Sequence, residues 1–155
     1  MNKLIFVLSA LVAAIGIVQP ALADTANVGA FAGFGITGQP VIGFDARAGS
    51  IFQSLSLRPY INFGSGTTNY GGAVTFDLSP TQNSNSDFYI GTGIGYVNTQ
   101  KKGDYLDKPD YFDIYAIVGV DQEVSNNLVF KGNVTVPLLN LGSSTTVNAG
   151  IGMTF

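Results

Sequence analysis

The chain has 155 residues, no cysteine and no histidine, and only 11% of its residues are charged, against about 25% in an ordinary globular domain. The missing cysteines exclude a disulfide framework and thiol chemistry. With 7 basic and 10 acidic residues the net charge is −3, which argues against nucleic-acid binding because that function needs a basic surface.

The first residues have the pattern of an export signal. Lys3 gives a positive start, residues 4–18 are apolar and uncharged, a proline follows, and residues 21–23 form the small-x-small pattern that a signal peptidase reads. A membrane-spanning helix needs roughly 20 apolar residues, so a cleaved signal is favoured over a retained anchor. We therefore expect a signal peptide at residues 1–23 and a single domain at residues 24–155.

Beyond this segment, apolar and polar residues alternate with a period of two, and turn residues interrupt the alternation at short intervals. Such alternation is typical of strands with two different faces. It predicts eight strands, an even number, at residues 25–36, 41–48, 55–63, 67–78, 87–97, 111–121 and 128–136 and in a last segment that ends the chain.

The charges within these strands all lie on the polar face. They are Asp45, Arg47, Arg58, Asp77, Asp87, Asp113, Asp121 and Lys131. A soluble barrel would need many charges on its outer face, whereas here the other face has none and must meet something apolar. A closed barrel is the one β structure that can do so without leaving backbone groups unpaired in lipid. The pattern predicts an all-β, eight-stranded, antiparallel up-and-down transmembrane β-barrel.

Outward aromatic residues are expected at two levels, as in the girdles that interfacial aromatics form at the edges of the hydrocarbon. With a periplasmic amino terminus, the outer level holds Phe34, Phe63, Tyr70, Tyr96 and Phe112, and the inner level holds Phe76, Phe88, Phe130 and Phe155. An even number of strands returns the chain to its starting side, so both mature termini are expected in the periplasm.

Four stretches carry a resemblance to a known family: SLSLRPYINFG at residues 54–64, FYIGTGIGYV at 88–97, VGVDQEVSNNLVFKG at 118–132, and the end AGIGMTF. Over its whole mature length the chain resembles the small bacterial outer-membrane barrels of the OmpA transmembrane domain and OmpX type. The resemblance implies a monomer among outer-membrane lipids. It also implies delivery by periplasmic chaperones and insertion by the barrel-assembly machinery, with Phe155 ending the assembly signal.

The expected outer loops are modest, which leaves little material for the protruding ledge of OmpX-type barrels. Only residues 98–110 have length. This loop and the start of the next strand hold Asp104, Asp107, Asp110 and Asp113, which are possible calcium ligands. Their spacing is not that of an EF-hand and nearby lysines offset their charge, so a solvated loop without a metal is favoured.

Catalysis has little support in the sequence. The enzymes among small outer-membrane barrels depend on a histidine, which titrates near neutral pH, and this chain has none. No nucleophile is recognisable beside Lys131. We expect no enzymatic activity and no cofactor, and a lipid-modifying enzyme is the least favoured alternative.

The charges in the lumen are the best-defined polar feature. Asp45 is expected roughly opposite Arg58, with Arg47 as a neighbour, and Lys131 on a strand that pairs with the one carrying Asp113 and Asp121. An eight-stranded barrel is just wide enough for side chains to fill, and buried charges must be paired or hydrated. A structural plug is favoured over a narrow, gated solute path.

Two further features of the lumen follow from the same strand assignment. Asp77 and Asp87, which flank residues 79–86, are expected to be solvated carboxylates at the rim. Inward glycines, at positions 91, 93 and 95, are expected to make room for tyrosine and arginine side chains. The predicted function is a non-enzymatic outer-membrane barrel that contributes to envelope structure or surface interaction, and the alternative is a narrow channel for small solutes or ions.

Overall fold

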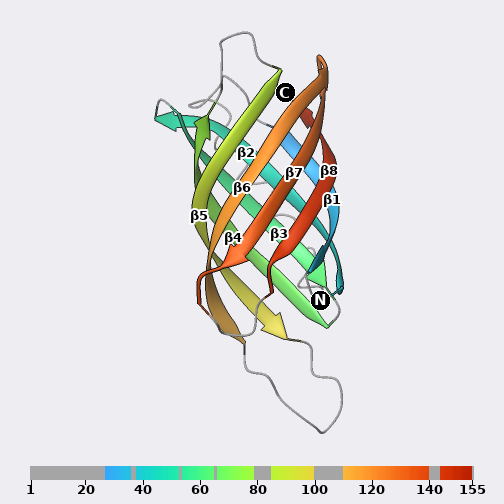
Figure 1. Ribbon diagram of the computed structural model, residues 1–155, viewed down its shortest axis with the longest axis vertical. Coiled ribbons are helices and arrows are strands. Elements are labelled where there is room, and N and C mark those ends of the chain that lie inside the picture. Colours follow the sequence, from blue (N-terminus) through green and yellow to red (C-terminus); the bar gives the residue numbers. More distant parts are fainter. Residues whose placement is uncertain are drawn as a thin grey trace, which may run out of the picture.

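The chain forms a closed β-barrel of eight strands, as predicted (Figure 1). The computed structural model describes residues 27–35, 38–52, 54–64, 66–78, 85–99, 110–139 and 144–154. The strands are β1 (Asn27–Gly35), β2 (Pro40–Phe52), β3 (Leu55–Gly64), β4 (Thr67–Leu78), β5 (Ser86–Thr99), β6 (Tyr111–Ser125), β7 (Leu128–Pro137) and β8 (Thr146–Thr154). The predicted signal peptide and Phe155 lie outside the described residues. Within the described ranges there is no apolar helix of membrane-spanning length.

Every strand pairs antiparallel with its neighbours in sequence, and β1 also pairs with β8 along its whole length. Asn27 lies opposite Thr154, and Gly35 lies opposite Thr146. This closure leaves no free sheet edge, which is the condition for a sheet to be stable in lipid. We call the end that carries Asn27 and Thr154 the terminal end, and the opposite end, near Gly66, the loop end.

Two loop-end turns are tight because glycines adopt a backbone conformation that other residues rarely reach. Gly64 pairs with Thr67, so residues 65–66 alone connect β3 to β4, and Gly66 has a φ of 77°. Between β1 and β2, Gly38 has a φ of 79°. Glycine adopts positive φ without steric cost, and two-residue hairpins require it. These turns help to fix the register of β1 with β2 and of β3 with β4.

Side chains alternate between the lumen and the outer face. In β1, Phe31 is buried in the lumen, whereas Phe34 is 64% exposed. The charged residues follow the predicted parity. All of them are buried except Asp87, whose side chain is 30% exposed at the terminal end. The lumen is therefore a polar core, and the outer face is its apolar counterpart.

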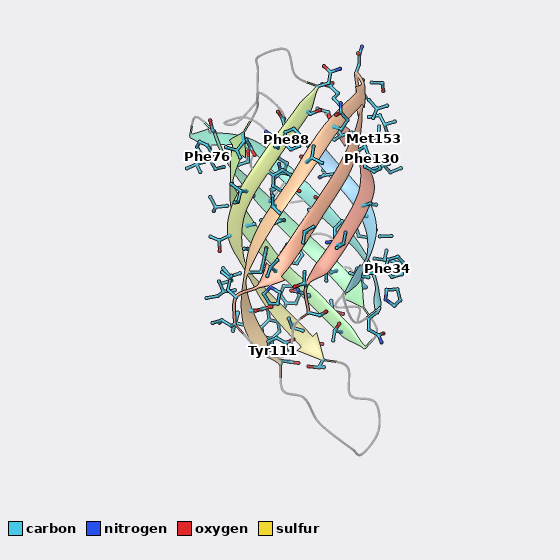
Figure 2. All side chains as sticks on the ribbon, in the orientation of Figure 1. Phe34, Phe76, Phe88, Tyr111, Phe130 and Met153 are labelled. Atoms are coloured by element: carbon cyan, nitrogen blue, oxygen red, sulfur yellow. The ribbon has the colours of Figure 1, made fainter. Side chains whose placement is uncertain are left out.

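Aromatic side chains lie on the outer face at both ends of the barrel. Figure 2 shows Phe76, Phe88 and Phe130 near the terminal end and Phe34 near the loop end. At the loop end, Tyr70, Tyr96 and Phe112 form a row across β4, β5 and β6, with successive ring centroids 5.4 and 5.1 Å apart. Of the predicted girdle residues, Phe155 is outside the described part of the chain.

Two strands run further than the sequence pattern indicates. β2 continues to Phe52 through a register shift after Ala48, and β6 continues to Ser125 through a shift after Glu123. Both extensions lie at the terminal end, where backbone pairing goes on although the alternation of apolar and polar residues has stopped. Periodicity reports the faces of a strand, so it underestimates strand length where both faces are polar or irregular.

Candidate functional site: the barrel lumen

Large side chains in the lumen pack against glycines of the neighbouring strands. A Cβ added at Gly93 would collide with the hydroxyl of Tyr115, its partner across β5 and β6, and one added at Gly119 would collide with that of Tyr89. The space for these rings is therefore made by the missing glycine side chains, as predicted. Gly91 differs from the prediction, because its neighbour is Thr75 rather than a tyrosine or an arginine.

Arg47 is the centre of the first group of ion pairs. Its Nη2 lies 2.9 Å from Oδ2 of Asp77, and its Nη1 lies 2.7 Å from Oδ2 of Asp87. The hydroxyl of Ser56 donates a hydrogen bond to the same oxygen of Asp77. The prediction that Asp77 is a solvated rim carboxylate is wrong: it is buried, because Arg47 from β2 and Arg58 from the adjacent β3 both extend to it.

Arg58 is the centre of the second group. Its Nη1 lies 2.8 Å from Oδ2 of Asp121, its Nη2 lies 3.6 Å from Oδ1 of Asp77, and its Nε donates a 3.0 Å hydrogen bond to Oγ1 of Thr75. The guanidinium carbon lies 3.5 Å from the ring centroid of Tyr89. A buried arginine with charged, polar and aromatic contacts of this kind is held in one position.

Lys131 forms the third group and is 2% exposed. Its Nζ lies 2.8 Å from Oδ2 of Asp45 and donates a 2.8 Å hydrogen bond to Oδ1 of Asn27. The amide of Asn27 in turn donates a 3.5 Å hydrogen bond to Asp121, which links this group to that of Arg58. The three groups together form one continuous network, the lumen network.

The lumen network crosses the interior of the barrel. Arg47 connects β2 to β4 and β5, Arg58 connects β3 to β4 and β6, and Lys131 connects β7 to β2. Strands three positions apart on a ring of eight are almost opposite each other. Three of the ion pairs, Arg47–Asp87, Arg58–Asp121 and Lys131–Asp45, therefore lie across the barrel axis in the half nearer the terminal end.

Sequence reasoning placed these charges in the lumen but assigned wrong partners. Asp45 contacts Lys131 rather than Arg58, and Arg58 contacts Asp121. Lys131 is opposite Asp121 in strand register, yet its ammonium reaches Asp45. Asp113 has no ion pair to Lys131. The error has a physical cause: register fixes which backbones are adjacent, whereas long side chains in a narrow barrel meet across its axis.

The sequence pattern did not single out the uncharged polar partners of this network, although their positions on the inward face of the strands indicated them. They are Asn27, Ser56 and Thr75, which are all buried. Uncharged polar residues at inward positions of a narrow barrel are expected to satisfy the charges there, since buried polar groups are nearly always hydrogen-bonded.

The half of the lumen nearer the loop end has a different character. It contains a cavity of about 80 Å³ whose lining includes Tyr60, Tyr89, Asp113, Tyr115 and Asn148. The rings of Tyr60 and Tyr115 are in edge-to-face contact, with centroids 5.6 Å apart. Asp113 is buried beside them.

Of the acidic residues in the predicted loop, Asp110 accepts hydrogen bonds from residues at the end of β5. Its Oδ2 accepts hydrogen bonds of 2.9 Å from the hydroxyl of Tyr96 and from the amide of Asn98, and its Oδ1 accepts one of 2.9 Å from the backbone N–H of Thr99. Asp104 and Asp107 lie outside the described residues. In the part of the chain that is described, no three acidic side chains come together as a metal site.

No model of a known protein family matches the chain, and no curated protein matches it. Solved structures do. The N-terminal β-barrel domain of Pseudomonas aeruginosa OprF is similar with a TM-score of 0.71 and 10% identity, over 84% of this chain and 97% of that one. A de novo designed transmembrane β-barrel is similar with a TM-score of 0.62 and 19% identity, over 84% and 95% of the two chains.

A third similar structure is the outer-membrane protein Ail of Yersinia pestis, with a TM-score of 0.58 and 10% identity, over 84% of this chain and 98% of that one. At these identities the likeness concerns the fold. Because a designed barrel is among the similar structures, the fold by itself specifies no activity. The resemblance seen in the sequence is confirmed at this level: the chain has the fold of the small, eight-stranded bacterial outer-membrane β-barrels.

Proposed function

We propose that the protein is an integral outer-membrane barrel that contributes to envelope structure or surface interaction and has no enzymatic activity. The observation that carries the proposal is the distribution of charge. In the described strands every charged side chain has inward parity, while Phe, Ile, Leu and Val side chains are exposed on the outside. A face of this kind is stable in lipid and is an aggregation hazard in water.

The lumen network favours a structural role over conduction. Ions or solutes would have to pass three arginine or lysine side chains whose partners lie on nearly opposite strands. Opening such a path separates buried ion pairs, and removing one partner of such a pair typically costs about 3–5 kcal/mol. The lumen is therefore proposed to be closed at rest, and the narrow channel remains the alternative that the experiment below addresses.

The surroundings of Lys131 support the absence of catalysis. The chain has no histidine, so a lysine would be the remaining general base for a serine nucleophile. Here the ammonium of Lys131 is bound to Asp45 and Asn27. With its Nζ atom occupied by these two buried partners and 2% of the residue exposed, Lys131 is not placed beside a serine hydroxyl of the described residues, which supports a structural role for this residue.

The placement in the cell follows from the same proposal. The terminal end would face the periplasm and the loop end would face outward, with the aromatic side chains of both ends at the two membrane interfaces. Insertion would depend on periplasmic chaperones and the barrel-assembly machinery, for which Phe155 after β8 would complete the signal. The barrel is proposed to act as a monomer surrounded by outer-membrane lipids.

The experiment that tests the closed lumen is single-channel recording from the pure, folded protein in planar bilayers. We expect no steady openings from the wild-type protein, because the lumen network blocks the axis. A variant with Arg47→Ala and Arg58→Ala, shown to be folded by its heat-dependent mobility in gels, serves as the comparison and is expected to admit ions. Steady openings of the wild-type protein would favour the channel function instead.

A further inference from the structure

The buried charges of the described residues do not balance. They comprise three bases and four acids: Arg47, Arg58 and Lys131, and Asp45, Asp77, Asp113 and Asp121. Each base lies within 2.9 Å of a different buried acid, namely Asp77, Asp121 and Asp45. The remaining acid is Asp113, which is 4% exposed and has neither an ion pair nor a hydrogen bond within the described part of the chain.

The cavity beside Asp113 is lined by atoms that accept hydrogen bonds. Side-chain oxygens without a hydrogen-bond partner belong to five of its lining residues: Asp45, Asn62, Asp113, Tyr115 and Asn148. Among the described residues that line the cavity, two donors also lack a hydrogen-bond partner: the hydroxyl of Tyr115, which can accept as well as donate, and Nη2 of Arg58, which faces Asp77. Buried polar atoms are nearly always satisfied, so the cavity suits a guest that is positively charged.

We propose that the loop half of the lumen binds one monovalent inorganic cation, Na⁺ or K⁺, with Asp113 as its charged ligand. The hydroxyl of Tyr115 and one or two water molecules would complete the oxygen shell, since a water takes about 30 Å³ and the cavity measures about 80 Å³. One cation neutralises the one unmatched carboxylate. Counting the buried charges alone, a divalent ion would leave an excess positive charge, which is costly to bury.

This site goes beyond the proposed function and does not depend on whether the lumen conducts. The cavity borders the lumen network, since Asp45 and Arg58 are among its lining residues, and it extends toward the loop end, where Pro137, Ser144 and Thr146 line it. Asp113 is on β6 opposite Gly95 of β5, and the side chains of Tyr60 and Asn69 occupy the space left by that glycine.

The test is the thermal unfolding of the purified barrel in a nonionic detergent at constant ionic strength, with choline chloride replaced stepwise by NaCl or KCl. A ligand that binds the folded state raises the midpoint as its concentration rises. We expect a saturating rise for the wild-type protein and none for Asp113→Asn. Glu123→Gln removes one carboxylate at the exposed terminal end and is expected to keep the wild-type response.

A second variant gives a graded result. Tyr115→Phe removes only the hydroxyl and keeps the ring in contact with Tyr60, so it is expected to fold and to shift the half-saturating salt concentration upward by about tenfold, the loss of one contact to a charged group. This variant decides the matter if Asp113→Asn does not fold.

Three results would overturn the proposal. The first is a wild-type midpoint that is the same in choline, sodium and potassium chloride, which would mean that no metal cation binds beside Asp113. The second is an unchanged salt response in either Asp113→Asn or Tyr115→Phe. The third is a response to CaCl₂ at concentrations about a hundredfold below those of NaCl, which would assign the site to a divalent ion.

Discussion

Gly95 shows how one residue without a side chain sets the packing of the lumen. A Cβ at this position would collide with the hydroxyl of Tyr60 and would lie 2.7 Å from Oδ1 of Asn69. Both neighbours are side chains, and the hydroxyl of Tyr60 donates a 3.2 Å hydrogen bond to that oxygen. Gly132 on β7 differs, because a Cβ there would meet only Cγ1 of Val120 at 3.8 Å.

Gly95→Ala is therefore expected to lower the free energy of unfolding by about 1–3 kcal/mol, the usual effect of overpacking. Gly132→Ala is the control and is expected to change it by no more than about 0.5 kcal/mol. Adding Tyr60→Phe to Gly95→Ala removes the closest colliding atom and should recover part of the loss. Denaturant unfolding in detergent measures the free energy of unfolding of each variant. Equal effects of the two glycine substitutions would contradict the inference that the missing side chain of Gly95 makes room for Tyr60.

At the scale of the strands, the lumen network joins elements that are distant in the sheet. Arg58 reaches from β3 to Asp121 on β6. Arg58→Ala is expected to destabilise the barrel by about 3–5 kcal/mol, because it leaves buried carboxylates without their cation. Adding Asp121→Ala should recover part of this loss, whereas adding Asp45→Ala should not, because Asp45 is the partner of Lys131.

The double-mutant cycle isolates the pairing itself, since contacting residues couple and residues with separate partners are nearly additive. Each variant is compared by its thermal midpoint in detergent and by denaturant unfolding. A stronger coupling of Arg58 to Asp45 than to Asp121 would show that the cross-lumen pairs differ from those described.

The strands also show which features of the structure can be predicted from the sequence. Period-two alternation located all eight strands and the face on which each charge lies, because a lipid-exposed sheet tolerates no charge on its outer face. It did not supply the ion-pair partners, since these depend on how far Arg47, Arg58 and Lys131 extend across the lumen. Nor did it show that Ile61, on the outer face, is only 2% exposed, which results from its position between Phe44 and Tyr70.

At the scale of the whole molecule, the proposed orientation has a direct test. With both termini in the periplasm, the longest connection at the loop end, residues 98–110, faces outward. A protease added to intact cells is expected to cut within this segment if it cuts at all. Cleavage confined to residues 79–86, at the terminal end, would mean that the barrel has the opposite orientation.

At the same scale, the features that the sequence predicts define the fold of the protein and not its activity. Composition, the export signal and the alternation predicted a closed membrane barrel, and these features are shared by barrels with different roles. The candidate cation site depends on a charge imbalance that appears once the ion pairs are known. The sequence predicts eight charged residues on the inward face and does not distinguish Asp113 from the others. Asp113 stands out once the structure shows that the other seven form ion pairs with one another.

The cross-lumen ion pairs have a consequence for the order of assembly. Lys131 on β7 finds its partner on β2, next to the β1–β8 seam. A flat sheet made hairpin by hairpin would expose these unpaired charges to lipid, at a cost of several kcal/mol each. We therefore expect transfer into the bilayer and curling of the sheet to proceed together, with the last hydrogen bonds of the seam forming at the same step as the last ion pair. Kinetic measurements of insertion should accordingly find a single cooperative phase for both events.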